Sequence, residues 1–251
     1  MLTVRNLSKS FGGVKAVQEV SFAIEPKTIH SVIGPNGAGK TTLFNLISGV
    51  YTPTDGDISL EGASITRKRP DELARLGMSR TFQNLQICMN MSAIENVMVG
   101  AHLRLRTSFW RGMLRLPGMW RAERECRDEC AALMAFAGVG AYLNAQASQM
   151  SYGALKRLEI ARALASRPKL LLLDEPAAGL NQTETAEIGT LIRKVADSGV
   201  TVLLVEHDMK LVMNLSDRIL VLDYGKRLAE GTAAEVRANP EVVAAYLGAS
   251  A

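Results

Sequence analysis

Residues 34–42 of this chain read Gly34-Pro35-Asn36-Gly37-Ala38-Gly39-Lys40-Thr41-Thr42 and fit the pattern G-x-x-x-x-G-K-[ST]. The apolar, β-branched stretch 28–33 predicts a buried strand before this phosphate loop, and the stretch 43–47 predicts a helix after it. Such a loop turns backbone N–H groups toward an anion, and the helix N-terminus adds partial positive charge. We expect Lys40 to reach the β- and γ-phosphates of a nucleotide and the Thr41 hydroxyl to ligate Mg²⁺. The alternative, a glycine-rich turn that matches by chance, is disfavoured by the flanking strand and helix.

The composition fits a folded protein of a reducing compartment. Of its 251 residues 47% are hydrophobic, and the excess of 29 basic over 25 acidic residues is too small to indicate nucleic acid. Cys88, Cys126 and Cys130 form no C-x-x-C pair, so we expect free thiols. The chain shows no signal sequence and no run near the ~18 apolar residues of a spanning helix. We therefore expect a cytoplasmic protein that reaches a membrane only through a partner.

The periodicity of the apolar residues predicts strands in the first part of the chain and helices in the middle. Alternation in 2–25 around Gly12-Gly13 predicts an antiparallel hairpin, and 56–65 predicts a second strand pair. A short helix is expected at 71–76, and the helical period prevails from Ser92 to about Ala165.

The last third of the chain returns to strands. Two apolar runs, 170–173 and 201–205, flank a helical stretch at 184–196, and this β-α-β pattern predicts a parallel sheet. A hairpin is expected at 219–230, followed by a helical tail that starts with a capping box at Thr232. We predict one unit, 1–251, made of an α/β core with an antiparallel β subdomain (1–91 and 166–231), an inserted α-helical subdomain (92–165) and a C-terminal tail (232–251).

Two carboxylates follow the run of four leucines, at the end of a strand where open α/β sheets bind ligands. We expect Asp174 to hold Mg²⁺ and Glu175 to orient or deprotonate the water that attacks the γ-phosphate. His207 follows the next core strand, so it meets Glu175 if the two strands are neighbours, and it is expected to contact the γ-phosphate. A single histidine is more often structural, and His30 and His102 receive that interpretation.

A second anion site is expected at a helix that begins near Ser151. The Ser151 side chain can cap this helix, and Gly153 loosens the first turn. Because many helices begin with S-x-G, this pattern alone is weak evidence.

Together these motifs resemble the nucleotide-binding subunits of ATP-binding-cassette (ABC) transporters, in order and spacing from Leu2 to Gly248. The resemblance implies a P-loop NTPase core of the ABC ATPase type, with ATP and Mg²⁺ as ligands. It further implies roles for single residues. Phe11, supported by Val17, stacks on adenine; Gln83 senses Mg²⁺; Ser151-Tyr152-Gly153 forms the signature segment; Asn181 belongs to the loop between sites; and His207 is the switch histidine.

Within this family the chain most resembles the branched-chain amino acid ATP-binding subunits. The segments that carry this likeness are Arg80-Thr81-Phe82-Gln83-Asn84, Ser151-Tyr152-Gly153, Pro176-Ala177-Ala178-Gly179-Leu180-Asn181, Glu206-His207-Asp208-Met209 and Ala245-Tyr246-Leu247-Gly248. Three positions depart from the pattern: Ala154 replaces Gln, Lys27-Thr28 replace Gly-Glu, and Gln182 replaces Pro. We predict that Ala154 weakens the signature contact to ATP without abolishing it.

The segment 103–121 interleaves arginines with aromatic residues and holds no acidic residue. We weigh three interpretations: a solvated loop, a surface that contacts anionic headgroups or a permease, and a platform for single-stranded nucleic acid. The loop is favoured, and nucleic acid is the least favoured. The residues concerned are Arg104, Arg106, Phe109, Trp110, Arg111, Arg115, Trp120 and Arg121.

The resemblance implies partners as well. Two ATP-binding subunits, identical or sibling, would close head to tail around two ATP molecules and drive an integral membrane permease that is fed by a solute-binding protein. The ATPase would then lie at the cytoplasmic face of the membrane. The alternatives are a lipid or lipopolysaccharide exporter and an ABC ATPase linked to nucleic acid, although the chain shows one cassette and no sustained heptads.

Overall fold

A six-stranded, mostly parallel sheet forms the centre of the molecule in the computed structural model, which describes residues 1–104 and 117–248. Its three middle strands are buried along their whole length, as expected for strands covered on both faces. The strand order is β10 (Lys226–Gly231), β9 (Arg218–Asp223), β3 (Ile29–Ile33), β8 (Thr201–Val205), β7 (Leu170–Asp174) and β6 (Met78–Arg80), with β10 antiparallel to β9 and the other neighbours parallel. The register pairs Asp174 with Val205, so β7 and β8 end side by side.

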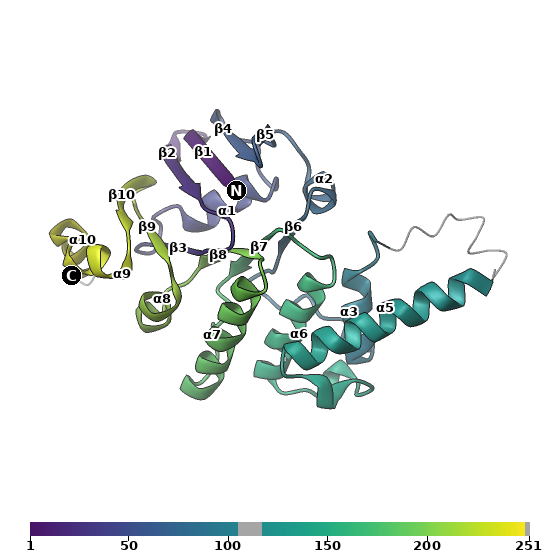
Figure 1. Cartoon of the computed structure of the whole chain (residues 1–251). Coiled ribbons are helices and arrows are strands. Elements are labelled where there is room, and N and C mark those ends of the chain that lie inside the picture. The colour runs from purple at the N-terminus through teal and green to yellow at the C-terminus, as the bar shows by residue number, and fades with distance from the viewer. Residues whose placement is uncertain (105–116, 249–251) are drawn as a thin grey trace.

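The second sheet is antiparallel and contains the N-terminal hairpin. Its strands stand in the order β2 (Val14–Ile24), β1 (Leu2–Phe11), β4 (Asp55–Leu60) and β5 (Ala63–Ser64). Helix α1 (Lys40–Ile47) lies between the two sheets (Figure 1) and buries Leu43, Phe44, Leu46 and Ile47 in the core that they share. This placement holds the first turn of α1 at the edge where β3 ends.

A group of helices covers the other side of the central sheet and extends beyond its β6 edge (Figure 1). Helices α3 (Ala93–Gly100), α5 (Pro117–Phe136) and α6 (Tyr152–Leu164) pack on one another, with 3₁₀ turns at Gly140–Tyr142 and Ala147–Gln149. Their core continues under α7 (Gln182–Asp197) and α8 (Met209–Leu215). A short helix, α2 (Pro70–Arg75), precedes β6.

The C-terminal helices lie at the opposite edge of the central sheet, next to β9 and β10 (Figure 1). Helix α9 (Ala233–Ala238) begins with the predicted capping box at Thr232, and α10 (Pro240–Gly248) follows it. Both helices contribute to a small core with β3 and β9, which includes Ile33, Val221, Val236 and Val242.

The structure confirms the predicted fold class and adds two elements that the sequence did not predict. Strand β6 has three residues, two of them Ser79 and Arg80, so its apolar periodicity is too short to detect. Helix α8 follows His207-Asp208, where Asp208 caps it by accepting a hydrogen bond from the Leu211 N–H at 3.0 Å. The boundaries of the predicted subdomains stay a prediction. Across the described part of the chain, no helix combines the length and the apolar character needed to cross a membrane.

Candidate active site

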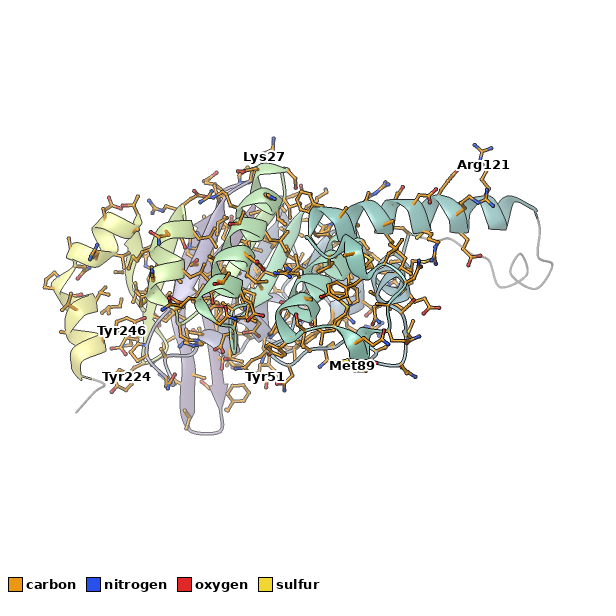
Figure 2. All side chains as sticks on the ribbon, turned by 90° about the horizontal axis from the view of Figure 1, so that it is seen from below. Lys27, Tyr51, Met89, Arg121, Tyr224 and Tyr246 are labelled. Carbon is orange, nitrogen blue, oxygen red and sulfur yellow. The ribbon has the colours of Figure 1, made fainter. Side chains whose placement is uncertain are left out.

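The phosphate loop connects β3 to α1 at the carboxyl end of the parallel strands. Figure 2 shows Lys27, which precedes β3, at one edge of the molecule, and Tyr51, which follows α1, at the opposite edge. The backbone at Gly34 has φ 152°, and a Cβ there would collide with the Leu222 carbonyl. At Gly39, with φ 96°, a Cβ would collide with the Ala16 carbonyl. The packing of β9 and β2 against the loop therefore requires glycine at both positions.

Lys40 points back over the entrance of the loop. Its Nζ donates hydrogen bonds to the carbonyls of Gly34 and Pro35 at 2.7 and 2.9 Å. Partial burial lowers the pKa of Lys40, and the nearby charge of Glu175 opposes that shift. Thr41, at the start of α1, is exposed. The loop thus presents a cation and an accessible hydroxyl at the same helix N-terminus.

Glu175 lies near His207, as predicted for the ends of neighbouring strands, and also contacts Gln83. Its Oε2 accepts a hydrogen bond from Gln83 Nε2 at 2.9 Å and lies 3.8 Å from His207 Nδ1. The three side chains come from the loop after β6 and from the ends of β7 and β8, which the sheet order brings together. Together with Lys40, they form a cluster at one edge of the sheet.

Asp174 has a partner that the sequence analysis did not identify. Arg80 Nη2 lies 2.7 Å from Asp174 Oδ2, and the two side chains are 10% and 8% exposed. The other nitrogen, Nη1, donates to Asn45 Oδ1 at 2.7 Å and to Ser48 Oγ at 2.6 Å. Arg80 thereby ties β6 and β7 to the last turn of α1. A buried arginine requires an acidic partner, but the sequence could not show which acid lies beside it.

Glu206 is a second residue that the sequence analysis left without a role. It is 1% exposed, and its carboxylate accepts the backbone N–H of Ala177 at 2.8 Å and of His207 at 3.1 Å. Burial raises the pKa of Glu206, and these hydrogen bonds limit the rise. The carboxylate therefore connects the loop after β7 to the residue that follows β8.

Ser151 caps α6, as predicted, and accepts a hydrogen bond from the Ala154 N–H at 3.3 Å. Tyr152 is 45% exposed, and its ring lies against Gly179 in the loop after β7. Asn181 caps α7 by accepting the Glu184 N–H at 3.0 Å. Among the described residues, no hydrogen bond joins Ser151, Tyr152 or Asn181 to the phosphate loop. The signature segment thus adjoins the start of α7.

Ala154, which replaces the Gln of the family pattern, is 0% exposed and belongs to the core below α6. At the surface Ala154 therefore contributes only its backbone N–H, which donates a hydrogen bond to the Ser151 hydroxyl. Its predicted effect on the signature contact to ATP stays a prediction.

The two residues predicted to contact adenine differ in exposure. Phe11 is 44% exposed, with Tyr51 edge-on at 5.3 Å between ring centroids and Lys9 Nζ 5.1 Å from its ring centroid. Val17 is 1% exposed and packs in the core between the sheets. Phe11 can receive a flat ring, whereas the expected side-chain contact of Val17 with nucleotide is not supported, because the side chain is buried.

The remaining histidines and cysteines lie outside this cluster. Burial, with a smaller contribution from Arg218, lowers the pKa of His30 to about 4, and its ring packs on Phe22. Cys126 and Cys130 are buried on α5 as free thiols with their Sγ atoms 4.0 Å apart. In the described ranges no three or more His, Cys, Asp or Glu residues form a metal cluster.

The arginine-rich segment is described only at its ends. Arg104 Nη2 pairs with Glu129 at 2.7 Å, and Nη1 donates to the Ala165 carbonyl at 3.0 Å, so Arg104 braces α6 against α5. Arg121 pairs with Glu125 on the exposed side of α5. Arg106, Phe109, Trp110, Arg111 and Arg115 lie outside the described residues.

Comparisons with known proteins identify the family of this chain. A family model described as ABC transporter matches residues 17–178, and one described as branched-chain amino acid ATP-binding cassette transporter matches 226–251. The chain is 46% identical to the high-affinity branched-chain amino acid transport ATP-binding protein BraF of Pseudomonas aeruginosa, over 99% of this chain and 98% of that protein. It is 45% identical to LivG of Escherichia coli K12, a protein of the same description, with the same coverage.

Solved structures give the same result. The ADP conformation of MJ1267, an ATP-binding cassette of an ABC transporter, has a TM-score of 0.87 and 31% identity, covering 99% of this chain and 98% of that one. The dimeric cassette MJ0796 in a post-hydrolysis state with ADP and Pi has a TM-score of 0.75 and 27% identity, covering 93% and 99%. This chain therefore belongs to the ABC transporter ATPases, in the family of branched-chain amino acid transport ATP-binding proteins.

Proposed function

We propose that this ATPase drives the import of branched-chain amino acids through a membrane permease. The observation that carries the catalytic part is the cluster of Lys40, Gln83, Glu175 and His207 at the carboxyl edge of the sheet. The substrate class is supported by the names of the relatives, which also favour transport of amino acids over lipid export or nucleic-acid work.

In the proposed reaction Glu175 accepts a proton from the attacking water. A carboxylate that Gln83 and His207 approach from two directions is held in one orientation toward the end of the phosphate loop. His207 is 64% exposed in its side chain, so it can turn toward the γ-phosphate while it remains near Glu175. Lys40 provides the positive charge that the γ-phosphoryl group needs as it leaves.

The donor set of this edge fits a hard cation. A hydroxyl, a carboxylate and an amide oxygen, from Thr41, Asp174 and Gln83, are the oxygen ligands that Mg²⁺ prefers. Mg²⁺ would neutralise the charge of the phosphate oxygens when bound. The ion pair of Asp174 with Arg80 fixes the carboxylate on β7, which favours a contact through water over direct ligation.

The complete ATP site is proposed to need a second cassette. Ser151, Tyr152 and Asn181 form an exposed surface around the first turns of α6 and α7, with Gly153 buried against Glu184 beneath it, and the phosphate loop of a second subunit would meet this surface. The first turn of a capped helix carries partial positive charge suited to the γ-phosphate. The dimeric cassettes among the solved relatives support this arrangement, with either an identical or a sibling partner.

The permease is proposed to dock in a groove beside Gln83. The groove encloses about 310 Å³ between β6, α2, α3 and α6. Its rim includes Phe82, Val50 and Val99, which are 44%, 48% and 46% exposed. Arg80 lies in its wall, so a segment bound there would adjoin both Gln83 and the partner of Asp174. Through this groove the protein would lie at the cytoplasmic face of the membrane.

Co-purification and reconstitution test the proposed function. The chain is purified from membranes with its bound subunits, and ATP-driven uptake of labelled leucine, isoleucine and valine is measured in proteoliposomes with a solute-binding protein. We expect uptake of at least one of these and none with Glu175→Gln. Stimulation of ATP hydrolysis by a lipid, with no uptake of amino acids, would contradict the assigned substrate class.

A further inference from the structure

The tight turn between β9 and β10 has no role in the reaction described so far. Its two residues, Tyr224 and Gly225, have φ of 42° and 78°, the pattern of a two-residue type I′ hairpin turn. A bulky residue such as tyrosine rarely adopts a positive φ, so its neighbours must hold it in this conformation. Tyr224 is 82% exposed, so its ring contributes little to this hold. The backbone of the turn therefore carries the contacts that fix it.

Gln18 of β2 binds this turn twice. Its side-chain Nε2 donates a hydrogen bond to the Tyr224 carbonyl at 2.9 Å, and its backbone N–H donates to the Gly225 carbonyl at 2.7 Å. On the other side, the Gly225 N–H donates to the carbonyl of Ala38 in the phosphate loop at 3.1 Å. The turn thus lies between β2 and the phosphate loop and is hydrogen-bonded to both.

These three backbone segments are also in close contact. A Cβ at Gly225 would lie 2.7 Å from the carbonyl oxygen of Ala16 in β2, and a Cβ at Gly39 in the phosphate loop would lie 2.4 Å from the same atom. Both distances are shorter than real Cβ contacts, so only glycine fits at either position without a shift of the backbone. Because the turn, β2 and the loop touch through backbone atoms, a displacement of the turn changes the position of β2 relative to the loop.

The contacts of the turn join two parts of the proposed nucleotide site. Phe11, which is expected to stack on adenine, pairs with Val14 of β2, so its position depends on that strand. Tyr51, whose ring packs edge-on against Phe11, lies at the same edge of the molecule as Tyr224 (Figure 2). The turn is therefore placed to set the separation between the adenine-stacking ring and the phosphate loop.

The phosphate loop has internal hydrogen bonds that hold its own shape. The Ala38 N–H donates to the Pro35 carbonyl at 3.2 Å, and the Leu43 N–H donates to the Gly39 carbonyl at 2.9 Å. The two hydrogen bonds that Lys40 Nζ donates also end on carbonyls of the loop. We therefore expect the phosphate cradle to persist when the turn is loosened.

We propose that Gln18 is a positioning residue for nucleotide binding, which acts through the turn 224–225 to fix the separation between Phe11 and the phosphate loop. The proposal rests on the nucleotide site assigned above. A nucleotide occupies both parts of that site, so it binds more tightly when their separation is already correct. An inorganic polyphosphate occupies the loop alone and gains nothing from the same constraint.

The test is Gln18→Met, which keeps the length of the side chain and removes its N–H donor, while the backbone bond to Gly225 remains. We expect the Kd for ADP, measured by calorimetric titration, to rise about 2–10-fold, which is the range for one lost hydrogen bond. The Kd for inorganic tripolyphosphate should stay unchanged. The matched control is Ser21→Ala on the same strand, which removes the hydroxyl that accepts the Asn6 N–H at 2.7 Å and should change neither Kd. An unchanged Kd for ADP in Gln18→Met, an equal rise for both ligands, or the same rise in Ser21→Ala would overturn the proposal.

A double variant tests whether Gln18 acts through Phe11. Phe11→Ala should itself raise the Kd for ADP, and Gln18→Met should then add little in that background. If Phe11→Ala has no effect on ADP, or if the two changes multiply, the proposal fails. Lys40→Ala serves as the reference for the site. Loss of ADP binding in Lys40→Ala with normal binding in Gln18→Met rejects the role of Gln18 alone, whereas normal binding in Lys40→Ala rejects the nucleotide site itself.

Discussion

Glu175, which we assign as the general base, has an unusual backbone conformation. Its φ of 47° lies in the left-handed region, which costs a residue with a side chain on the order of 1–3 kcal/mol. The backbone N–H of Glu175 donates to the Val205 carbonyl at 2.9 Å, so the end of β8 holds it in this conformation. In this conformation the carboxylate contacts Gln83 and lies near His207.

Replacing Glu175 by Gln tests its role as the base. The amide keeps the size of the side chain but cannot accept the proton of water, so we expect kcat to fall by about 10²–10⁴-fold. Affinity for ATP should be kept, because Lys40 and the loop backbone are unaltered. Equilibrium binding and phosphate release check the two parts, with Lys40→Ala as the variant that should lose affinity. Hydrolysis by Glu175→Gln at the normal rate would falsify the assignment.

Arg80→Met tests the buried ion pair with Asp174. Both side chains are nearly buried, so removal of Arg80 leaves an uncompensated carboxylate, and we expect the free energy of unfolding to fall by about 3–5 kcal/mol. Denaturation by urea measures this loss. The second change Asp174→Asn should restore part of it. Arg121→Met removes an exposed ion pair on α5 and should have little effect. Equal losses from Arg80→Met and Arg121→Met would show that the buried ion pair contributes no more to the free energy of unfolding than the exposed one.

At the scale of elements, sequence patterns predicted most of the structure but missed the three-residue strand β6 and the seven-residue helix α8. The leucines of β7, the alternation of β1 and β2 and the capping box of α9 were all identified. Contacts that depend on which strands are neighbours were not identified, and Arg80 with Asp174 and Glu206 with Ala177 are examples. Each joins residues that are 29 or more positions apart, and no local pattern encodes the pairing.

The burial of His30 in β3 predicts an acid-sensitive contribution to stability. Its folded-state pKa is about 4, below the 6.5 of an unperturbed histidine. Between these values the unfolded chain binds a proton that the folded protein excludes. The contribution is therefore fully present above pH 6.5 and is lost as the pH falls toward 4. The loss should reach about 3 kcal/mol.

Unfolding experiments at several pH values isolate this contribution. His30→Leu should flatten the decline in the free energy of unfolding between pH 6.5 and 4. The raised pKa values of Glu159 and Glu206 act with the opposite sign, but they are present in both proteins and cancel in the difference. His102→Leu is the control, because this side chain is exposed. An unchanged pH dependence in His30→Leu would show that folding does not lower the pKa of His30.

At the scale of the whole molecule, the proposed function places two halves of an ATP site on different elements of the chain. The phosphate loop lies at the end of β3. Ser151 caps α6, whose Gly153 lies against Glu184 in the first turn of α7, the helix that Asn181 caps. Glu206 connects the loop beside Asn181 to His207, so a partner seated on the Ser151 surface would act on the catalytic cluster of this chain. Two such chains, placed head to tail, would complete both sites.

This arrangement is tested by Ser151→Arg in the Glu175→Gln background, where ATP should hold the dimer closed. The bulky cation removes the cap oxygen and obstructs the surface that meets the partner's ATP. We therefore expect ATP-induced dimerisation, measured by analytical ultracentrifugation, to be lost. Binding of ATP to the monomer should persist, because Ser151 has no hydrogen bond to the phosphate loop among the described residues. Ser198→Arg, an exposed serine at the other end of α7, is the control and should leave the dimer intact. A dimer that persists with Ser151→Arg, or one that Ser198→Arg disrupts equally, would place the interface on another face of the molecule.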